Sequence, residues 1–295
     1  MQLLRKLARW VNDPPPEYVF EISEAGIAWT RGGAPQPGFV PLAPGVLQVN
    51  PLKDNVRQPD AFQAAVKGVV NGAGARKRKP AAVILPDYCA RVAVLDFDSF
   101  PSSPEEQGPL VRFRAKKAVP FDIDAAALSF TVQQRPGTKR YDVVAAVVGL
   151  EILARYEAAF RAAGLHPGWV TTSSLAALSL VPGDGLTVTV KAAGRVLTAA
   201  VQQGNWLRLL RCVELEELNQ DEVMGVLYPT VAFTEDELGQ RPARLYLCGL
   251  GALAGDIQAM SEAELRLPAE PLRSQFGVPG PNNAGLLGYL EATRG

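Results

Sequence analysis

The chain has little of what most metal sites and nucleophilic hydrolases require, because its 295 residues include one histidine and three cysteines. Cys89, Cys212 and Cys248 are widely spaced and form no CxxC pair, so we interpret them as small buried hydrophobes in a reducing compartment. We place His166 in a turn between a helix and a strand, where it is partly exposed. There is also no Gly-x-Ser-x-Gly elbow. The sequence therefore predicts no catalytic residue and no metal site, which argues against a hydrolase without excluding one.

Net charge and long apolar runs are lacking too. The 30 basic residues equal the 30 acidic ones, whereas proteins that bind nucleic acid need a basic excess for phosphate contacts. No run of about 20 apolar residues is present, so a membrane-spanning helix is not expected. Residues 1–11 contain no long apolar core or cleavage site of a signal peptide. These absences favour a cytoplasmic protein, and 47% hydrophobic residues suffice for a sizeable core.

An amphipathic pattern is present at the start of the chain. In residues 1–11 the side chains of Leu3, Leu4 and Leu7 share one side of a helix, and Arg5 and Arg9 share another. This pattern fits a helix that docks on a membrane surface or a partner. It also fits a helix that packs on its own domain or frays, because isolated helices this short are marginal in water.

The central block, residues 81–134, predicts strand, strand, helix and strand. Residues 81–85 and 92–97 are apolar and rich in Val and Leu, as expected of strands. A helix is expected from Ser103 to Lys117, with acidic residues in its first turn and basic residues in its last. A strand over 140–149 and an amphipathic helix over 151–164 follow.

The two halves of the chain open in the same way. Residues 18–26 align without gaps with residues 186–194, and both segments predict a strand that enters a hairpin at a glycine. The second half continues with a strand over 206–212, a helix over 219–231 and a strand over 245–248 that meets Gly249-Leu250-Gly251. This repeat indicates a duplicated α/β unit.

The central block, together with LYLCGLGALA at 245–254 and AGLLGYLEA at 284–292, resembles the PilM-like proteins of type IV pilus assembly. The GspL proteins of type II secretion are a related alternative. The resemblance implies an α/β, actin-like (ribonuclease H-like) duplicated fold, with two lobes around a cleft and a small inserted α+β subdomain. We expect an amphipathic segment at 1–11, a first lobe at 12–170 with the insertion at about 99–150, a second lobe at 171–280, and a C-terminal helix at 281–295 that returns to the first lobe.

The resemblance also implies a cleft for ATP and magnesium, in which each opening hairpin presents Asp-x-Gly. Here the Asp positions hold Glu21 and Thr189, and the Gly positions hold Ser23 and Lys191. A third element resembles the turn that holds adenosine in actin-like proteins and contains Gly249 and Gly251, although tight packing of a strand on a helix explains it equally well. Glu24 places a carboxylate where a triphosphate would lie and would repel it. We therefore expect a degenerate nucleotide site, a pseudo-ATPase and no bound cofactor.

In PilM-like proteins a groove between the first lobe and its insertion accepts an N-terminal segment of the membrane protein PilN. The residues of this chain that match that region are Arg112, Arg114, Lys117, Val119 and Phe121. They suggest an apolar floor with a basic rim, although Phe121 could equally be core and the basic residues solvated.

We therefore expect a cytoplasmic scaffold, peripheral at the inner membrane, that binds a PilN-like peptide and no nucleic acid. The alternatives are an active actin-like ATPase or kinase, a GspL-like secretion component, and an unrelated α/β protein.

Overall fold

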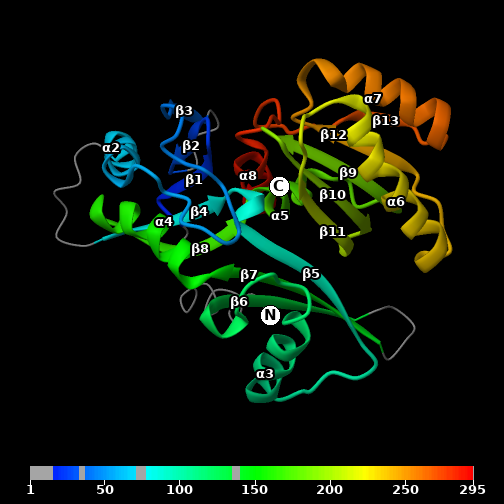
Figure 1. Cartoon of the computed structure of the whole chain (residues 1–295), viewed down its shortest axis with the longest axis horizontal. Helices are drawn as coiled ribbons and strands as arrows, with labels where there is room; N and C mark the ends of the chain where they lie inside the picture. Colours follow the sequence, from blue (N-terminus) through cyan, green and yellow to red (C-terminus); the bar gives the residue numbers. More distant parts are fainter. Residues whose placement is uncertain (1–15, 33–36, 71–77, 135–139, 295) are drawn as a thin grey trace, which may run out of the picture.

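The computed structural model describes residues 16–32, 37–70, 78–134 and 140–294, so the amphipathic segment predicted at 1–11 lies outside the described residues. The fold consists of two lobes and a small subdomain that lies beneath both of them in Figure 1. Each lobe contains a five-stranded sheet. No helix in the described ranges combines the length and the apolar character that a membrane crossing requires.

The first lobe contains a sheet with the strand order β3-β2-β1-β4-β8. Its strands are β1 (Tyr18–Ser23), β2 (Gly26–Arg31), β3 (Gly38–Pro41), β4 (Lys79–Leu85) and β8 (Leu165–Thr172). β1, β2 and β3 form an antiparallel meander, whereas β4 and β8 continue the sheet in parallel. Helices α2 (Pro59–Val69) and α4 (Leu150–Ala162) pack on this sheet through Phe62 and Phe160. The Phe160 ring contacts the buried Phe20, and Phe62 contacts Phe160.

The second lobe repeats this plan with the order β11-β10-β9-β12-β13. Its strands are β9 (Leu186–Ala193), β10 (Val196–Gln203), β11 (Trp206–Glu214), β12 (Arg244–Cys248) and β13 (Ala269–Pro271). Its helices are α6 (Gln220–Leu238), α7 (Ala254–Met260) and a π-helical turn over Ser261–Leu265. The first three strands are again antiparallel and the last two parallel, so the duplication inferred from the sequence is present in the fold.

The two opening hairpins begin in register but turn at different points. Ser23 pairs with Gly26 across the first turn, whereas Ala193 pairs with Val196 across the second. β9 is therefore two residues longer than β1, although the gapless alignment starts both strands at equivalent positions.

The inserted subdomain contains a three-stranded sheet with the order β5-β7-β6. Its elements are β5 (Ala90–Phe97), α3 (Pro104–Ala115), β6 (Ala126–Gln134) and β7 (Tyr141–Gly149). The sheet includes β5, which lies before the boundary expected near residue 99. One face packs on α3, where Val143 and Ala145 join the cluster around Val111. The opposite face of β7 presents Val144, Ala146 and Val148.

Two helices between the lobes approach each other closely. α5 (Ser173–Ala177) and α8 (Ala284–Arg294) lie at the centre of the molecule in Figure 1. A Cβ at Gly288 would come within 2.1 Å of the Ala176 carbonyl oxygen, so only glycine permits this contact. Leu286 packs with the first lobe and Leu287 with the second, so α8 contacts both lobes.

The prediction of a turn around His166 is wrong, because this residue lies within β8 and is exposed. The residues that follow His166, Pro167 and Gly168, are typical of a turn. Here they occupy an edge strand, where Pro167 needs no ladder donor and Gly168 lies at a shift of register opposite Ala81 and Ala82.

Candidate functional sites

The cleft between the lobes contains a cavity of about 470 Å³ that is lined by residues from both. Of the six positions predicted for a degenerate nucleotide site, Glu21, Ser23 and Lys191 line this cavity, whereas Thr189, Gly249 and Gly251 do not. We call it the cleft cavity. Residues near the ends of β1 and β9 line it from opposite lobes.

Glu21 is 1% exposed and fully engaged by the protein. Its Oε1 atom accepts a hydrogen bond from the Ser173 hydroxyl, and Oε2 accepts one from the Leu286 backbone N–H at 2.7 Å. Burial raises the pKa of Glu21, although the attraction of Lys191 and these hydrogen bonds act in the opposite direction. The carboxyl group thus ties β1 to the starts of α5 and α8.

Lys191 crosses the cleft to a carboxylate of the first lobe. Its ammonium donates to Asp87 Oδ2 at 3.0 Å, and both side chains are buried. Burial alone would lower the pKa of Lys191, but the carboxylates of Asp87 and Glu21 raise it overall. The side chain of Lys191 therefore places a positive charge in the cleft, and Asp87 already neutralises that charge.

Asp87 is a site residue that the sequence analysis did not select. It lies in a short 3₁₀ turn, Asp87–Cys89, directly after β4. Its Oδ1 accepts from the Ser174 N–H at 2.6 Å, and Oδ2 accepts from the Ser174 hydroxyl at 2.6 Å as well as from Lys191. The sequence did contain one signal for Asp87, because it directly follows a buried strand, β4, that ends at the same edge of the sheet as β1.

The remaining predicted cleft positions maintain the local backbone. The Ser23 hydroxyl donates to the Gly26 carbonyl and accepts from the Gly26 N–H, which closes the first hairpin. Glu24 accepts from the Val49 N–H at 2.6 Å. Gly249 has a φ of +72°, and a Cβ there would lie 2.1 Å from the Ala192 carbonyl oxygen. This close approach accounts for Gly249 without a ligand.

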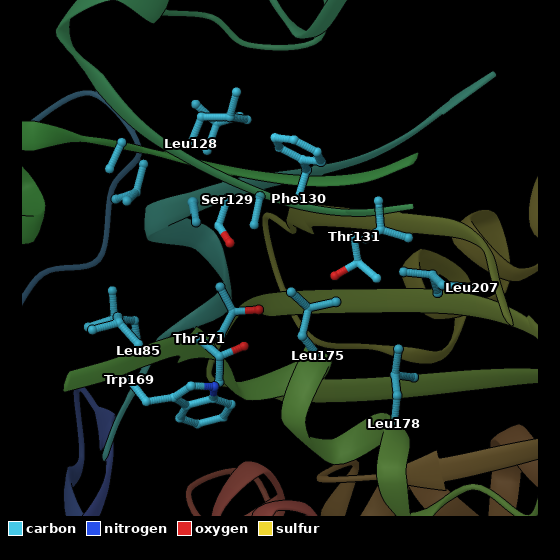
Figure 2. A pocket seen from close by; sticks show the side chains of 18 of the residues that line it. Leu85, Leu128, Ser129, Phe130, Thr131, Trp169, Thr171, Leu175, Leu178 and Leu207 are labelled. Carbon is cyan, nitrogen blue, oxygen red and sulfur yellow. The ribbon is translucent and has the colours of Figure 1, made fainter. Parts of the chain in front are cut away.

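A second cavity, of about 630 Å³, opens between the inserted subdomain and both lobes (Figure 2). Consecutive residues of β6 and of β8 line it, so both strands contribute an edge to its walls. The second lobe closes one end with Gln202, Asn205 and Leu207 from the β10–β11 hairpin, beside Leu178 of the 3₁₀ turn Leu178–Leu180. We call this cavity the groove.

Among the residues that the structure describes, none that lines the groove carries a charged side chain. The lining consists of aliphatic residues, small polar residues and two aromatic ones, namely Leu85, Ala90, Ala127, Leu128, Ser129, Phe130, Thr131, Gln133, Val144, Ala146, Val147, Val148, Leu153, Trp169, Val170, Thr171, Thr172, Leu175, Leu178, Ser179, Gln202, Asn205 and Leu207. Trp169 is 42% exposed, and its ring lies 5.2 Å from that of Tyr289 on α8. The groove is therefore a neutral, largely apolar channel with one aromatic wall.

The five residues predicted to bind a partner are not in the groove lining. The Arg112 guanidinium donates to the Ile123 and Ala126 carbonyls, and Arg114 donates to the Asp96 carbonyl at 2.8 Å. Residues Val119 and Phe121 pack in a cluster under the inserted sheet, while Lys117 is exposed. The basic rim expected from the sequence is thus absent from this groove, and the role of these residues in binding stays a prediction.

Two lobes built on the same strand order around a cleft define the class as actin-like. No protein-family model and no curated protein sequence matches the chain. Solved structures match its fold over almost the full length of both chains. A PilM–PilN type IV pilus biogenesis complex aligns with a TM-score of 0.71 and 18% identity, covering 94% of this chain and 98% of the other.

Two further structures align less closely. The cytoplasmic domain of EpsL, an inner-membrane component of the type II secretion system of Vibrio cholerae, gives a TM-score of 0.51 at 13% identity, with 94% of each chain covered. A Bacteroides thetaiotaomicron protein with an actin-like ATPase fold and unknown function gives 0.52 at 11% identity, with 93% and 96% covered. The resemblance inferred from the sequence is confirmed at the level of the fold.

Proposed function

We propose that the chain is a PilM-like component of a type IV pilus platform, in the cytoplasm at the inner membrane, which binds a short extended segment of a PilN-like partner in its groove. The observation that carries this proposal is the neutral groove between the edges of β6 and β8. The structural similarity to the PilM–PilN complex supports the choice of partner.

The chemistry of the groove favours an extended apolar segment. Exposed strand edges offer main-chain hydrogen bonds to an added strand, and such bonds bind any extended peptide regardless of its side chains. Selectivity then comes from the lining. A charged side chain would lose its hydration in the groove without meeting a counter-charge, which is costly, whereas Leu128, Phe130 and Leu207 would cover apolar side chains.

We further propose that the cleft no longer binds or hydrolyses ATP, so that the chain acts as a scaffold. A magnesium–triphosphate needs free carboxylate oxygens for the hydrated metal and backbone N–H groups that approach the phosphates closely. The Glu21 carboxylate is already held by Ser173 and Leu286, and Asp87 is held by Lys191 and Ser174. The residues present therefore do not fit this group.

Isothermal titration with MgATP tests the nucleotide proposal. We expect no magnesium-dependent heat of binding at millimolar nucleotide, and no turnover above that of the Glu21→Gln variant. Micromolar, magnesium-dependent affinity would favour the alternative of an active actin-like ATPase or kinase, in which Glu21 would replace the family aspartate.

Synthetic peptides of the cytoplasmic N-termini of membrane proteins encoded beside this gene test the groove. We expect micromolar binding that is at least tenfold weaker in Thr131→Glu, because a carboxylate would enter the neutral lining. Gln134→Glu is the matched control, since Gln134 is exposed on the same strand and does not line the groove. Equal affinity of both variants would place the partner elsewhere.

A second candidate is a GspL-like component of type II secretion, which the similarity to the EpsL cytoplasmic domain favours. The same peptide test separates the two, because the candidates differ in which membrane protein supplies the segment.

Peripheral attachment through residues 1–11 is tested by sedimentation with anionic vesicles, in which removal of these residues should abolish binding.

A further inference from the structure

One end of the groove contains polar atoms that the protein leaves without partners. Among the described residues, the buried side-chain atoms that lack a hydrogen bond are Tyr18 OH, Gln133 Oε1, Tyr156 OH, Thr189 Oγ1, Gln202 Oε1 and Arg208 Nε. Gln133 and Gln202 both line the groove. Buried polar atoms are almost always satisfied, so two unsatisfied acceptors in one cavity indicate a missing donor.

Gln133 belongs to the inserted subdomain and Gln202 to the second lobe, but a short series of neighbouring residues connects them. Gln202 of β10 pairs across the sheet with Leu207 of β11. The next residue, Arg208, forms a buried ion pair with Asp142 of β7, and Asp142 in turn pairs across the sheet with Gln133 of β6. This series of neighbours joins the second lobe to the inserted subdomain at the end of the groove where Figure 2 shows Thr131 and Leu207.

The side chain of Gln202 is held so that its oxygen remains available. The residue is 8% exposed, and its amide nitrogen donates to the Leu178 carbonyl at 3.5 Å. The ion pair of Arg208 and Asp142 is 10% and 3% exposed and fixes the β11 backbone against β7. The two glutamine oxygens are therefore carried by a region whose position is set by buried contacts.

We propose that Gln133 and Gln202 together accept hydrogen bonds from one uncharged donor group of the bound segment, so that the segment links the inserted subdomain to the second lobe. The inference rests on the proposed function. It adds that the first lobe, the inserted subdomain and the second lobe all contact the bound segment. A carboxamide NH₂ group has two N–H donors, one for each glutamine oxygen, and brings no charge into a lining whose described residues include no carboxylate.

A double-mutant cycle with the peptide used above tests this linkage. Gln133→Leu and Gln202→Leu should each weaken binding about tenfold, as expected for the loss of one buried hydrogen bond. The double variant should be weakened by less than the product of the single effects, because both residues serve the same group. Each has a neighbour as its matched control, namely Gln134→Leu on β6 and Gln203→Leu on β10, which lie outside the groove lining and should bind like the wild type.

Hydrogen exchange separates a binding role from a merely structural one. Peptide should protect backbone amides of β6 and also of the β10–β11 hairpin in the wild type, whereas in Gln202→Leu the protection of the hairpin should be lost and that of β6 kept. Binding without protection of the hairpin, or single variants with wild-type affinity, would overturn the inference while leaving the groove in place. If none of the peptides binds the wild type, the proposed function fails and this inference fails with it.

Discussion

The ion pair between Lys191 and Asp87 gives the sharpest test of how the lobes are held together. Lys191→Met keeps most of the apolar length of the side chain and removes the ammonium. Asp87 then remains as a buried carboxylate whose counter-charge is gone, although Ser174 still donates to it. Glu21 also loses the positive charge that opposes the effect of its burial.

The expected loss of stability follows from the burial of both partners. Lys191 and Asp87 have side chains that are 3% and 5% exposed, so solvent screens the pair little. Removal of one partner from a buried pair costs about 3–5 kcal/mol, because the other charge stays uncompensated. At about 2 °C per kcal/mol for a chain of this size, the melting temperature should fall by about 6–10 °C.

Thermal and urea unfolding followed by tryptophan fluorescence measure this change. The double variant Asp87→Asn/Lys191→Met should regain much of the loss, since the asparagine removes the stranded charge and can still bond to Ser174. Glu235→Gln, which breaks the exposed pair with Arg241, is the control and should change stability by less than about 1 kcal/mol. A loss below about 1 kcal/mol in Lys191→Met would refute the reasoning.

Three further variants test the surrounding structure. Because burial raises the pKa of Glu21 above its ordinary value of 4.5, wild-type stability should fall as pH rises through the interval above 4.5, and urea unfolding of Glu21→Gln from pH 4.5 to 8 should lack this slope. Gly288→Ala should cost about 1–3 kcal/mol in urea unfolding, because its Cβ would collide with the Ala176 carbonyl. Gly249→Ala should lower the melting temperature, since its left-handed backbone alone costs about 1–2 kcal/mol and Ala192 leaves no space; a wild-type value in either glycine variant would contradict the packing described here.

The sequence predicted the strands that carry Glu21, Ser23 and Lys191 because hairpins are local patterns. Alternating apolar residues and a glycine turn identified β1 and β9, which placed Glu21 and Lys191 near the ends of equivalent strands in the two lobes. The partners of these residues could not be predicted in the same way. Asp87 lies 104 residues from Lys191, and Leu286 lies 265 residues from Glu21, so only the folded topology brings them together.

The groove was missed for a different reason. The sequence analysis selected Arg112, Arg114, Lys117, Val119 and Phe121 because they match the partner-binding region of PilM-like proteins, and no motif pointed to the strands that line the groove. The groove lining is neutral and comes from strands of all three bodies, and Val144 and Ala146 face it only because side chains alternate along β7. A stretch such as Trp169-Val170-Thr171 is indistinguishable from an ordinary buried strand until β8 is known to be an edge.

The cleft and the groove are connected through the angle between the lobes. Buried ion pairs add little net stability compared with apolar replacements, and their best-supported role is to fix one arrangement among several. Lys191 with Asp87 joins the lobes at the cleft, and Arg208 with Asp142 joins the second lobe to the inserted subdomain beside the groove. Two lobes that flank a cleft can otherwise rotate about their connection.

This argument separates affinity from stability. Asp87→Asn/Lys191→Met should recover most of its stability and yet bind the groove peptide more weakly than the wild type, because the second-lobe wall is no longer held at one angle. Calorimetry with the peptide measures the difference, with Glu235→Gln again as the control. Wild-type affinity in the double variant would show that the packing of α8 on α5, rather than the buried pair, sets the angle between the lobes.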